Sequence, residues 1–372
     1  MKEGWEVRKL GDVCEINYGT RVVQKKDGGT IYPVYGGGGA TFKMDRYNRE
    51  DCIVVSRFAM SNQCVRYVRG KFFLNDSGLT VKTKEEKLSQ EYLDKCIFSL
   101  NDKIYSLGKG VAQKNLDMKE FRHLDINYPC SKDEQSRIVE ELDQLANIIE
   151  KKRQQLSELD NLAQSIFYDM FGDPVTNEKG WEVKPLKENV FEMFLGPFGS
   201  ALKVDSYVEK EDSYCIVYEQ KHAIQGTLDV MTHYINKDKY EALKRFEVKA
   251  GDFIMSCRGT IGKLYQLPQD SPLGIIHPSL MKIRIKESIY APKYFEFMLI
   301  KVVANESTNG NCVQMAITAK ELGNKKLPLP PLKLQQLFAQ KIEAIEKEKE
   351  LIKQSIKETE ELFNSRMDYY FG

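Results

Sequence analysis

A short stretch in the second half of the chain combines groups that proteins use to contact nucleic acid. Residues 251–263 read GDFIMSCRGTIGK, so an apolar strand pattern ends in a hydroxyl side chain, an arginine and a Gly-rich turn. Hydroxyl and cationic side chains, with the backbone N–H groups of such a turn, bind phosphates and base edges. We therefore expect four side chains of this stretch to contact DNA: Ser256, Arg258, Thr260 and Lys263.

The first half contains a looser counterpart, DCIVVSR at residues 51–57, and each half carries a later loop rich in Gly and amide side chains. These loops read GKGVAQKN (108–115) and NGNCVQ (309–314), and amide and cationic tips recognise adenine and guanine edges. The expected DNA contacts are Lys43, Arg57, Lys109, Gln113, Lys114 and Asn115 in the first half, and also Lys203, Asn309, Asn311 and Gln314 in the second. An ordinary surface role is the alternative for each of them.

The sequence offers no constellation of residues for catalysis. The Pro330-Pro331 pair lies at a helix start rather than in an acidic-Pro-Pro-aromatic methyltransferase loop, and the four His are scattered. The Gly-rich stretch 33–44 lacks the Lys-Ser/Thr of a phosphate-binding loop, which favours a turn against a neighbouring backbone. The eight Cys do not have zinc-finger spacing and are predicted to be reduced rather than bonded or metal-bound. We predict a chain without enzyme activity, cofactor or metal.

The overall charge excludes little, but its distribution is uneven. The chain has 55 basic and 54 acidic residues, yet residues 20–71 hold ten Lys/Arg against four Asp/Glu, and residues 131–172 hold five against nine. A basic region joined to an acidic helical one fits a modular anion binder, although a solvated basic face is the alternative. We expect a cytoplasmic protein, because we find neither a membrane-length apolar run nor a signal peptide.

The elements that must position these loops occur in two similar copies along the chain. The tetrapeptide GWEV occurs at 4–7 and at 180–183, and a helical pattern ends in Phe-Gly at 172 and at 372. Pro129 precedes Gln135 by the same spacing as Pro330 precedes Gln336. The repeat predicts one unit over residues 1–172 and a second over 173–372, in which the same order of short strands and helices recurs.

Each unit closes with a long amphipathic helix. Apolar residues recur with 4–3 spacing from Ile138 to Met170, interrupted by Lys152, and again from Phe338 to Phe363, interrupted by Lys349. This spacing is typical of a coiled-coil seam, and two such helices can cover each other if they run antiparallel. Two separate dimerisation helices are the alternative. The fold class is therefore α+β: two pseudo-symmetric mixed α/β domains joined by two long antiparallel coiled-coil helices.

Taken together, these features resemble the specificity (S) subunits of type I restriction–modification systems over essentially the whole chain. The resemblance rests on GWEV-x-x-L at 4–10 and 180–186, GDFIMSCRGTIGK, LPLPPLKLQQ at 327–336 and the two Phe-Gly endings. It implies target recognition domains over 1–130 and 173–326, and spacer helices over 131–172 and 327–372. The first half departs from the strand-turn motif, reading SRFAMSN, so its base-reading residues are the hardest to transfer.

The resemblance also implies partners. Double-stranded DNA with a bipartite target would be bound, two modification (methyltransferase) subunits would dock on the helices and around Trp5 and Trp181, and two restriction subunits could join. The S-adenosylmethionine would be held by the methyltransferase subunit. Two other interpretations stay open: a non-DNA coiled-coil scaffold with duplicated protein-binding domains, and an enzyme, such as a nuclease, that uses the same fold. Steeply salt-dependent DNA binding would distinguish a DNA-binding subunit from the non-DNA scaffold.

Overall fold

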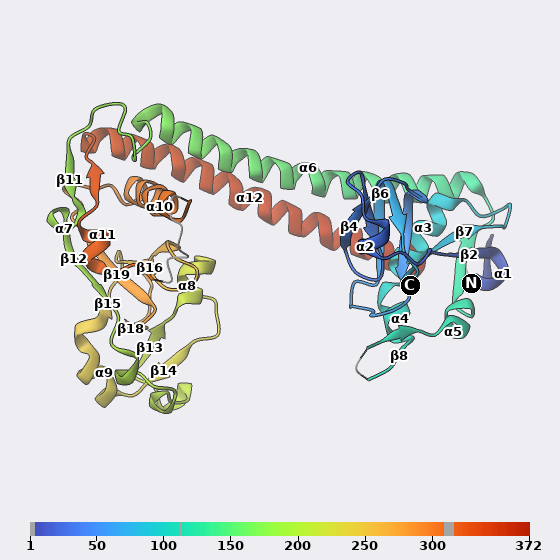
Figure 1. The fold of residues 1–372 in the computed structure, drawn as a ribbon, viewed down its shortest axis with the longest axis horizontal. Coiled ribbons are helices and arrows are strands. Elements are labelled where there is room, and N and C mark those ends of the chain that lie inside the picture. The colour runs from blue at the N-terminus through green and yellow to red at the C-terminus, as the bar shows by residue number, and fades with distance from the viewer. Residues whose placement is uncertain (1–3, 112, 309–315) are drawn as a thin grey trace. The chain divides into compact units, whose positions relative to one another are not determined.

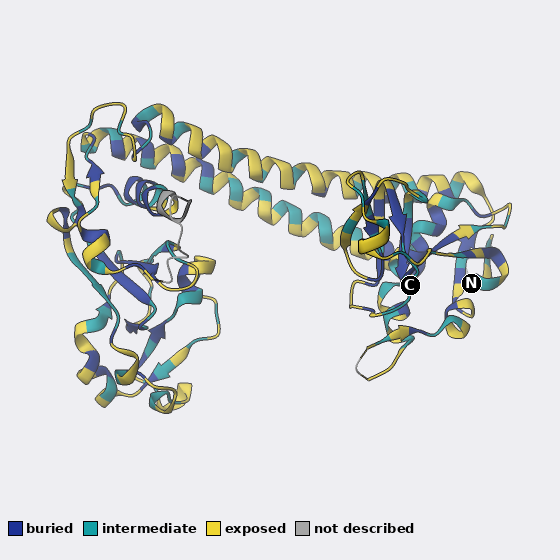
Figure 2. Ribbon diagram, in the orientation of Figure 1, coloured by how far each residue is buried: buried dark blue, intermediate teal, exposed yellow. Residues whose placement is uncertain are grey.

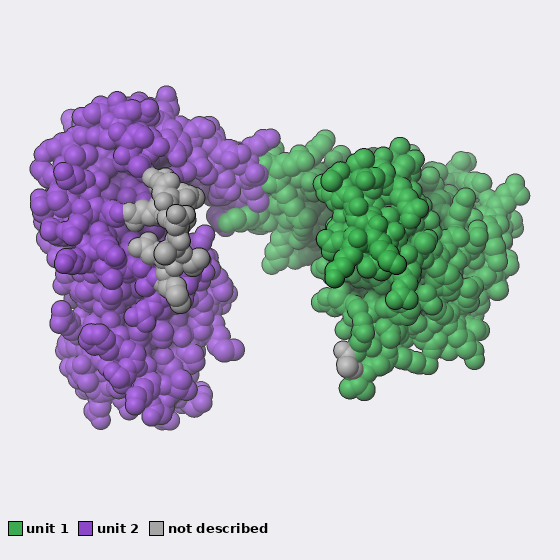
Figure 3. Space-filling view, in the orientation of Figure 1, with its two compact units in different colours: residues 1–155, 352–372 green, residues 156–351 purple. Residues whose placement is uncertain are grey.

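The computed structural model describes residues 4–111, 113–308 and 316–372, and the chain divides into two compact units. Unit 1 comprises Met1–Gln155 and Ile352–Gly372, and unit 2 comprises Leu156–Leu351 (Figure 3). Two 40-residue helices, α6 (Lys132–Phe171) and α12 (Leu332–Phe371), contribute to both units. Among the described residues, no helix is both long and apolar enough to cross a membrane.

Unit 1 is built on a six-stranded sheet in the order β2-β7-β5-β6-β3-β4 (Figure 1). Its elements before α6 are β1 (Trp5–Lys9), α1 (Leu10–Val13), β2 (Cys14–Tyr18), α2 (Gln24–Asp27), β3 (Tyr32–Tyr35), β4 (Ala40–Met44), β5 (Arg49–Ser56), β6 (Val65–Leu74), β7 (Gly78–Thr83), α3 (Gln90–Ser99), α4 (Asn101–Ser106), β8 (Gly108–Lys109), β9 (Asn115–Leu116), α5 (Met118–Arg122) and β10 (Asp125–Pro129).

Unit 2 contains two four-stranded sheets, β12-β19-β16-β17 and β14-β13-β18-β15. Its strands are β11 (Val183–Pro185), β12 (Val190–Leu195), β13 (Cys215–Tyr218), β14 (His233–Ile235), β15 (Glu247–Val248), β16 (Phe253–Ser256), β17 (Leu264–Gln266), β18 (Gly274–Ile276), β19 (Leu280–Ile285) and β20 (Lys326–Pro328). Its helices besides α6 and α12 are α7 (Leu186–Asn189), η1 (Gly199–Ala201), η2 (Val204–Ser206), η3 (Lys210–Asp212), α8 (Gln220–Gln225), α9 (Lys237–Leu243), η4 (Lys244–Phe246), α10 (Pro292–Thr308) and α11 (Ala319–Gly323).

The two units have the same strand topology, although unit 2 breaks two strands that are continuous in unit 1. The run β2-β7-β5-β6 corresponds to β12-β19-β16-β17. The remaining part of β6 pairs with β3 in parallel and β3 pairs with β4, just as β18 pairs with β13 in parallel and β13 pairs with β14. Strand β5 of unit 1 therefore corresponds to β15 plus β16, and β6 corresponds to β18 plus β17.

The break in unit 2 falls at a position where unit 1 has a β-bulge. In β5 the pairing register shifts between Glu50 and Cys52, and Asp51 between them has a positive φ of 40°. At the corresponding place in unit 2, Gly251 has a φ of 84° and lies between β15 and β16. Gly tolerates this left-handed conformation, whereas Asp51 is held there by its carboxylate, which accepts a hydrogen bond from the Gly70 N–H at 2.7 Å.

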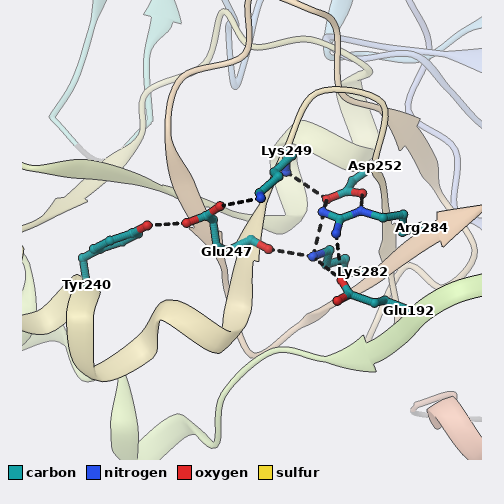
Figure 4. A network of polar contacts seen from close by, with 7 residues as sticks. All are labelled: Glu192, Tyr240, Glu247, Lys249, Asp252, Lys282 and Arg284. Atoms are coloured by element: carbon teal, nitrogen blue, oxygen red, sulfur yellow. Dashed lines mark hydrogen bonds and ion pairs between the residues drawn. The ribbon is translucent and has the colours of Figure 1, made fainter.

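A buried charge network joins the two sheets of unit 2 (Figure 4). Lys282 on β19 contacts the carboxylates of Glu192 on β12 at 2.7 Å and of Asp252 at 3.5 Å, and it donates to the Glu247 carbonyl of β15 at 2.9 Å. Arg284 makes two further hydrogen bonds to Asp252, at 2.6 and 2.7 Å. The Asp252 side chain is 1% exposed and that of Lys282 is 4% exposed, so the low dielectric strengthens their attraction.

The long helices pair antiparallel within each unit and complete its core. In unit 1, Glu141 of α6 forms an ion pair with Arg366 of α12. Lys152 of α6 donates hydrogen bonds to the hydroxyls of Ser355 and Thr359 on α12. In unit 2, Asp160 pairs with Lys349. The core of unit 1 includes Ile138, Leu142, Met367 and Phe371, and that of unit 2 includes Phe338, Ile342, Phe167 and Phe171. These sets are related by a shift of 200 residues, and the apolar seam is buried or half-buried along both helices (Figure 2).

A buried glutamine anchors the start of each long helix in the same way. The Gln135 amide donates to the carbonyls of Lys87 and Pro129, at 2.7 Å each, and its carbonyl accepts from the Ser89 N–H. The Gln335 side chain makes the corresponding bonds to Ile289, Pro330 and Ala291. The pairing of Gln135 with Gln336 inferred from sequence was therefore wrong by one residue, because Gln336 is exposed and Gln335 is buried.

Candidate nucleic-acid interface

The matching strands β5 and β16 end in turns that are held by the same backbone bonds. The Ser56 N–H donates to the Cys64 carbonyl at 2.7 Å, and the Ser256 N–H donates to the Lys263 carbonyl at 2.8 Å. The next residues, Arg57 and Cys257, donate to the carbonyls of Ser77 and Ser279. The two arginines that the sequence places in the motif thus occupy adjacent, not equivalent, positions, because Cys257 rather than Arg258 matches Arg57.

The two serines at these strand ends are fully buried. The Ser56 hydroxyl donates to the Gly37 carbonyl at 2.5 Å, and the Ser256 hydroxyl oxygen accepts from the Lys263 N–H at 3.0 Å. The expectation that Ser256 contacts DNA is corrected by this geometry, because its hydroxyl faces its own turn and has no exposed surface. Both serines shape the turns that present their neighbours.

In unit 1 the turn presents Arg57 between two aromatic rings. Its guanidinium carbon lies 4.7 Å from the centre of the Tyr18 ring and 4.6 Å from that of Phe58. Such contacts attract the cation to the ring faces and reduce the number of conformations of the side chain. A guanidinium held against aromatic rings can still use its N–H groups, which match the two acceptors of guanine.

The β8–β9 hairpin lies next to this turn, since the Met60 N–H donates to the Lys114 carbonyl at 3.0 Å. Of the expected contact residues in the hairpin, Gln113 is exposed, while Lys114 lies 4.1 Å from the Tyr105 ring centre. Lys109 forms an ion pair with Asp117, and the pKa of Lys109 is raised by the hydrogen bond to that carboxylate. The side-chain amide oxygen of Asn115 accepts weakly from the Ala59 N–H at 3.4 Å. The structure therefore brings Arg57 and the hairpin residues together.

In unit 2 the corresponding turn exposes Arg258, Thr260 and Lys263. Gly259 and Gly262 adopt φ values of 66° and 81°, and a Cβ on Gly262 would lie 2.7 Å from the Val303 side chain. These two positions explain why the turn needs glycine. The conformation of the turn thus depends on two positions that favour glycine.

Gln220, which the sequence pattern did not identify, supports the turn from α8. Its amide donates to the Arg258 carbonyl at 2.6 Å and more weakly to the Thr260 carbonyl at 3.4 Å. Gln220 begins the helix that follows β13, so only the pairing of β13 with the neighbouring strands brings it to the turn. A single glutamine in a short helix gives no signal of this role.

A second matched turn lies beside the first in each unit. Asn75 follows β6, which pairs in parallel with β3, and His277 follows β18, which pairs in parallel with β13. The N–H groups of Asn75 and His277 donate to the carbonyls of Tyr35 and Tyr218, at 2.8 Å each. Their side chains accept from the Ser77 and Ser279 N–H groups, at 2.9 and 3.2 Å. The common spacing of a polar residue two places before serine could have signalled this pair in the sequence.

The hydrogen bond to Nδ1 and the effect of burial both favour a neutral His277. Burial lowers the pKa of His277, and Nδ1 lies 2.8 Å from the Ser279 hydroxyl and 3.2 Å from the Ser279 N–H. A neutral imidazole keeps one donor and one acceptor nitrogen, so His277 can form hydrogen bonds without a charge. Nearby, burial acts to raise the pKa of Glu219, but the hydrogen bonds from Lys221 and His233 outweigh it and lower the pKa.

The other expected contact residues are more scattered. Lys43 is exposed on β4, the last strand of the unit 1 sheet, and lines a shallow surface depression with Gln24 and Thr41. Lys203 is exposed in the loop between η1 and η2. Asn309, Asn311 and Gln314 lie outside the described residues.

Comparisons with known proteins agree with the duplicated architecture. The family model described as the type I restriction modification DNA specificity domain matches residues 2–161 and 178–361. The putative type I restriction enzyme MjaX specificity subunit of Methanocaldococcus jannaschii is 24% identical over 272 residues, which cover 69% of this chain. The match spans 60% of the length of that relative.

Two solved structures share the fold over nearly their whole length. The type I restriction-modification system S subunit from M. genitalium is 15% identical with a TM-score of 0.57, covering 99% of this chain and 96% of its own. A chain from a structure described as the basis of complex assembly and conformational transition of the type I R-M system is also 15% identical. Its TM-score is 0.61, and the match covers 100% of this chain and 98% of its own.

Proposed function

Because the chain belongs to the type I restriction modification DNA specificity family, we propose that it is the DNA-reading subunit of a restriction–modification complex. Each unit reads one half of a bipartite double-stranded target, and the paired helices set the unspecified gap between the halves. The chain is not catalytic. Two methyltransferase subunits that hold S-adenosylmethionine dock on it and methylate one adenine in each half, and restriction subunits can join them.

One observation carries this proposal. The turns after β5 and β16 are held by equivalent backbone bonds, yet they present different side chains: Arg57 between aromatic rings in unit 1, and Arg258 and Thr260 on a Gly-rich turn in unit 2. A constant frame with variable tips suits two readers that contact related faces of DNA but recognise different bases. A scaffold that binds the same protein twice would be expected to repeat the tips as well.

The experiment expresses the chain with its partner methyltransferase subunit and maps methyladenine by long-read sequencing. The expected result is a two-part motif with a fixed gap, which disappears when this chain is omitted. A palindrome built from a single half would mean that only one unit reads DNA. If the methyltransferase binds the chain and yet no sequence is methylated, the DNA-reading proposal fails and the scaffold interpretation takes its place.

Salt dependence gives an independent test. A DNA reader neutralises phosphates, so its observed affinity must fall steeply as salt rises, with a slope set by the number of phosphates contacted. The salt slope of duplex binding by the chain–methyltransferase complex should be larger than that of the methyltransferase alone. Equal slopes would contradict a role for this chain in contacting DNA.

A further inference from the structure

One aromatic side chain of unit 2 is almost completely uncovered. Phe198 is 88% exposed, on the loop that follows β12. The loop reads Gly-Pro-Phe-Gly from Gly196 to Gly199, so the ring stands between residues with little or no side chain of their own. Exposing a whole phenyl ring to water is unfavourable, so a partner that covers the ring gains the free energy of its burial.

The loop that carries Phe198 is fastened on both sides. Before it, the Gly196 N–H donates to the Leu280 carbonyl at 2.9 Å. After it, the Ala201 N–H donates to the carbonyl of Phe198 itself at 2.8 Å, and Leu202 is buried in the core of the second sheet. The ring is thus presented by a fixed backbone.

The loop lies beside the turns described above. A Cβ on Gly196 would be only 2.3 Å from the His277 carbonyl oxygen, so the chain passes directly against the His277 turn. The His277 turn is also joined to the end of β16, which presents Arg258, because the Cys257 N–H donates a hydrogen bond to the Ser279 carbonyl. Exposed Lys203 follows on the same loop. The loop that carries the exposed ring therefore begins beside the hydrogen-bonding and cationic groups of the candidate DNA interface.

Unit 1 shows how the ring comes to protrude. Gly19 matches Gly196, because its N–H donates to the carbonyl of Gly78, the counterpart of Leu280. The next residue, Thr20, stays on the sheet by donating to the Leu74 carbonyl at 3.0 Å. In unit 2 that position is Pro197, which has no N–H, so this bond cannot form. The chain then leads to Phe198 instead of following the strand.

We propose that Phe198 is a wedge that inserts between two stacked base pairs of the half-site read by unit 2. This inference rests on the proposed function and adds a specificity-determining residue to it. Apolar side chains inserted in this way partly unstack a base step and kink the duplex. Because pyrimidine–purine steps unstack most easily, unit 2 would favour such a step at the wedge without hydrogen bonding to its bases. Unit 1 would read its half-site without this contribution.

The test uses the complex of the full chain with its methyltransferase and duplexes that carry the mapped target. The fluorescent adenine analogue 2-aminopurine is placed at each purine position of the unit 2 half-site in turn, leaving out the adenine that is methylated. We expect fluorescence to rise at the bases flanking one step when wild-type complex binds. Phe198→Ala should abolish that rise and weaken target binding by about tenfold, as loss of one base–aromatic stack does, while Phe198→Leu should preserve most of both.

Phe191→Ala is the matched control. Phe191 is 68% exposed on β12, the strand that leads into the Phe198 loop, so its loss removes a similar apolar surface. It should leave both the affinity and the fluorescence pattern unchanged. Unchanged Trp181 fluorescence of the isolated chain, measured for both variants in a Trp5→Phe background, would establish that unit 2 remains folded.

The outcomes separate this inference from the proposed function. If wild-type complex does not distinguish target from non-target DNA, the proposed function fails and the wedge with it. If it does distinguish them, but no fluorescence rise depends on Phe198, the wedge is overturned and the proposed function stands. The wedge is also overturned if Phe198→Ala weakens assembly with the methyltransferase in the absence of DNA, because the ring would then be a protein contact.

Discussion

The two units share a strand order but stabilise it differently. In unit 1, β5 and β6 run without interruption through the whole sheet, and a bulge at Asp51 bends the first of them. In unit 2 the same path is cut into shorter strands. There Asp252 holds Lys282 and Arg284 by ion pairs, and Lys282 also donates to the Glu247 carbonyl of the second sheet. Continuous backbone pairing and a buried charge network are thus two solutions to the same geometric problem, and they should respond differently to substitution.

The units also differ where β3 and β13 end. In unit 1 the Gly-rich stretch connects β3 to β4, and it approaches its neighbours closely: a Cβ on Gly37 would be 2.3 Å from the Phe58 carbonyl oxygen. In unit 2 the corresponding strand leads into α8, which carries Gln220. A shared frame with different connections lets side chains at the edge of the sheet change while the cores remain alike.

The largest difference between the units should appear when the charge network is broken. Asp252→Ala removes the buried carboxylate that Lys282 and Arg284 share and leaves them only the partly exposed Glu192. We expect unit 2 to lose about 3 kcal/mol of its free energy of unfolding. Each unit contains one tryptophan, so urea unfolding can be followed by Trp181 fluorescence in a Trp5→Phe background. Unchanged stability would mean that the buried ion pairs of Asp252 do not stabilise unit 2.

The matched control for that variant is Asp51→Ala in unit 1. Asp51 is exposed and accepts one hydrogen bond from the Gly70 N–H, and its φ is 40°. Losing that bond and placing Ala in a left-handed conformation should cost unit 1 about 1–2 kcal/mol. The loss is followed by Trp5 fluorescence in a Trp181→Phe background. A cost as large as that of Asp252→Ala would remove the distinction drawn between the units.

A smaller effect should be equal in both units. Gln135→Ala and Gln335→Ala each remove three hydrogen bonds to buried backbone groups, and leaving such groups unsatisfied costs about 1–3 kcal/mol. The same fluorescence assay should give similar losses for Trp5 in the first variant and Trp181 in the second. Gln336→Ala, at an exposed position, should change stability by less than about 0.5 kcal/mol. A loss in only one unit would show that the two anchors are not equivalent.

The smallest predicted difference is in how the stability of each unit changes with pH, because buried groups in the two units act in opposite directions. Burial lowers the pKa of His222 and of His277 in unit 2. Their contribution to stability is therefore present above the unfolded value near 6.5 and is lost as pH falls through the folded values. In unit 1, burial raises the pKa of Asp94 to about 6, so its unfavourable ionisation is relieved as pH falls through 6. Between pH 7 and pH 5, unit 2 should weaken relative to unit 1.

Glu296 of unit 2, whose pKa burial raises, offsets part of that change. Urea midpoints for each tryptophan at pH 7, 6 and 5 measure it. Asp94→Asn should remove the pH response assigned to unit 1, and His277→Asn, which places the unit 1 residue in the matching turn, should reduce that of unit 2. Parallel shifts of both midpoints would contradict the assignment.

The sequence predicted the parts of the fold that depend on periodic burial. The spacing of Ile138, Leu142 and Phe338 identified both long helices, because only one face of each is covered. The repeated frame likewise identified two similar units. The sequence matched Gln135 to Gln336 instead of Gln335, because the second copy contains an additional proline before the helix. Spacing alone does not show which of the two glutamines points inward.

The candidate site was less predictable for a physical reason. Gln220 and the Asn75–His277 pair reach their turns through parallel strand pairing between segments that are far apart in the chain. Local patterns do not encode that proximity. Ser256 was misassigned because a hydroxyl at a strand end can bond either to a ligand or to its own turn, and the direction of the side chain decides between them.

The most direct measurement of the central claim maps methyladenine for wild-type chain, Arg57→Ala and Arg258→Ala, each expressed with the same methyltransferase. The account predicts a bipartite wild-type motif in which each substitution relaxes bases in one half only, by about 1–3 kcal/mol of discrimination, and leaves the gap unchanged. If either substitution relaxed both halves, or if neither altered the motif, the claim that the two units are separate readers on a common frame would be contradicted.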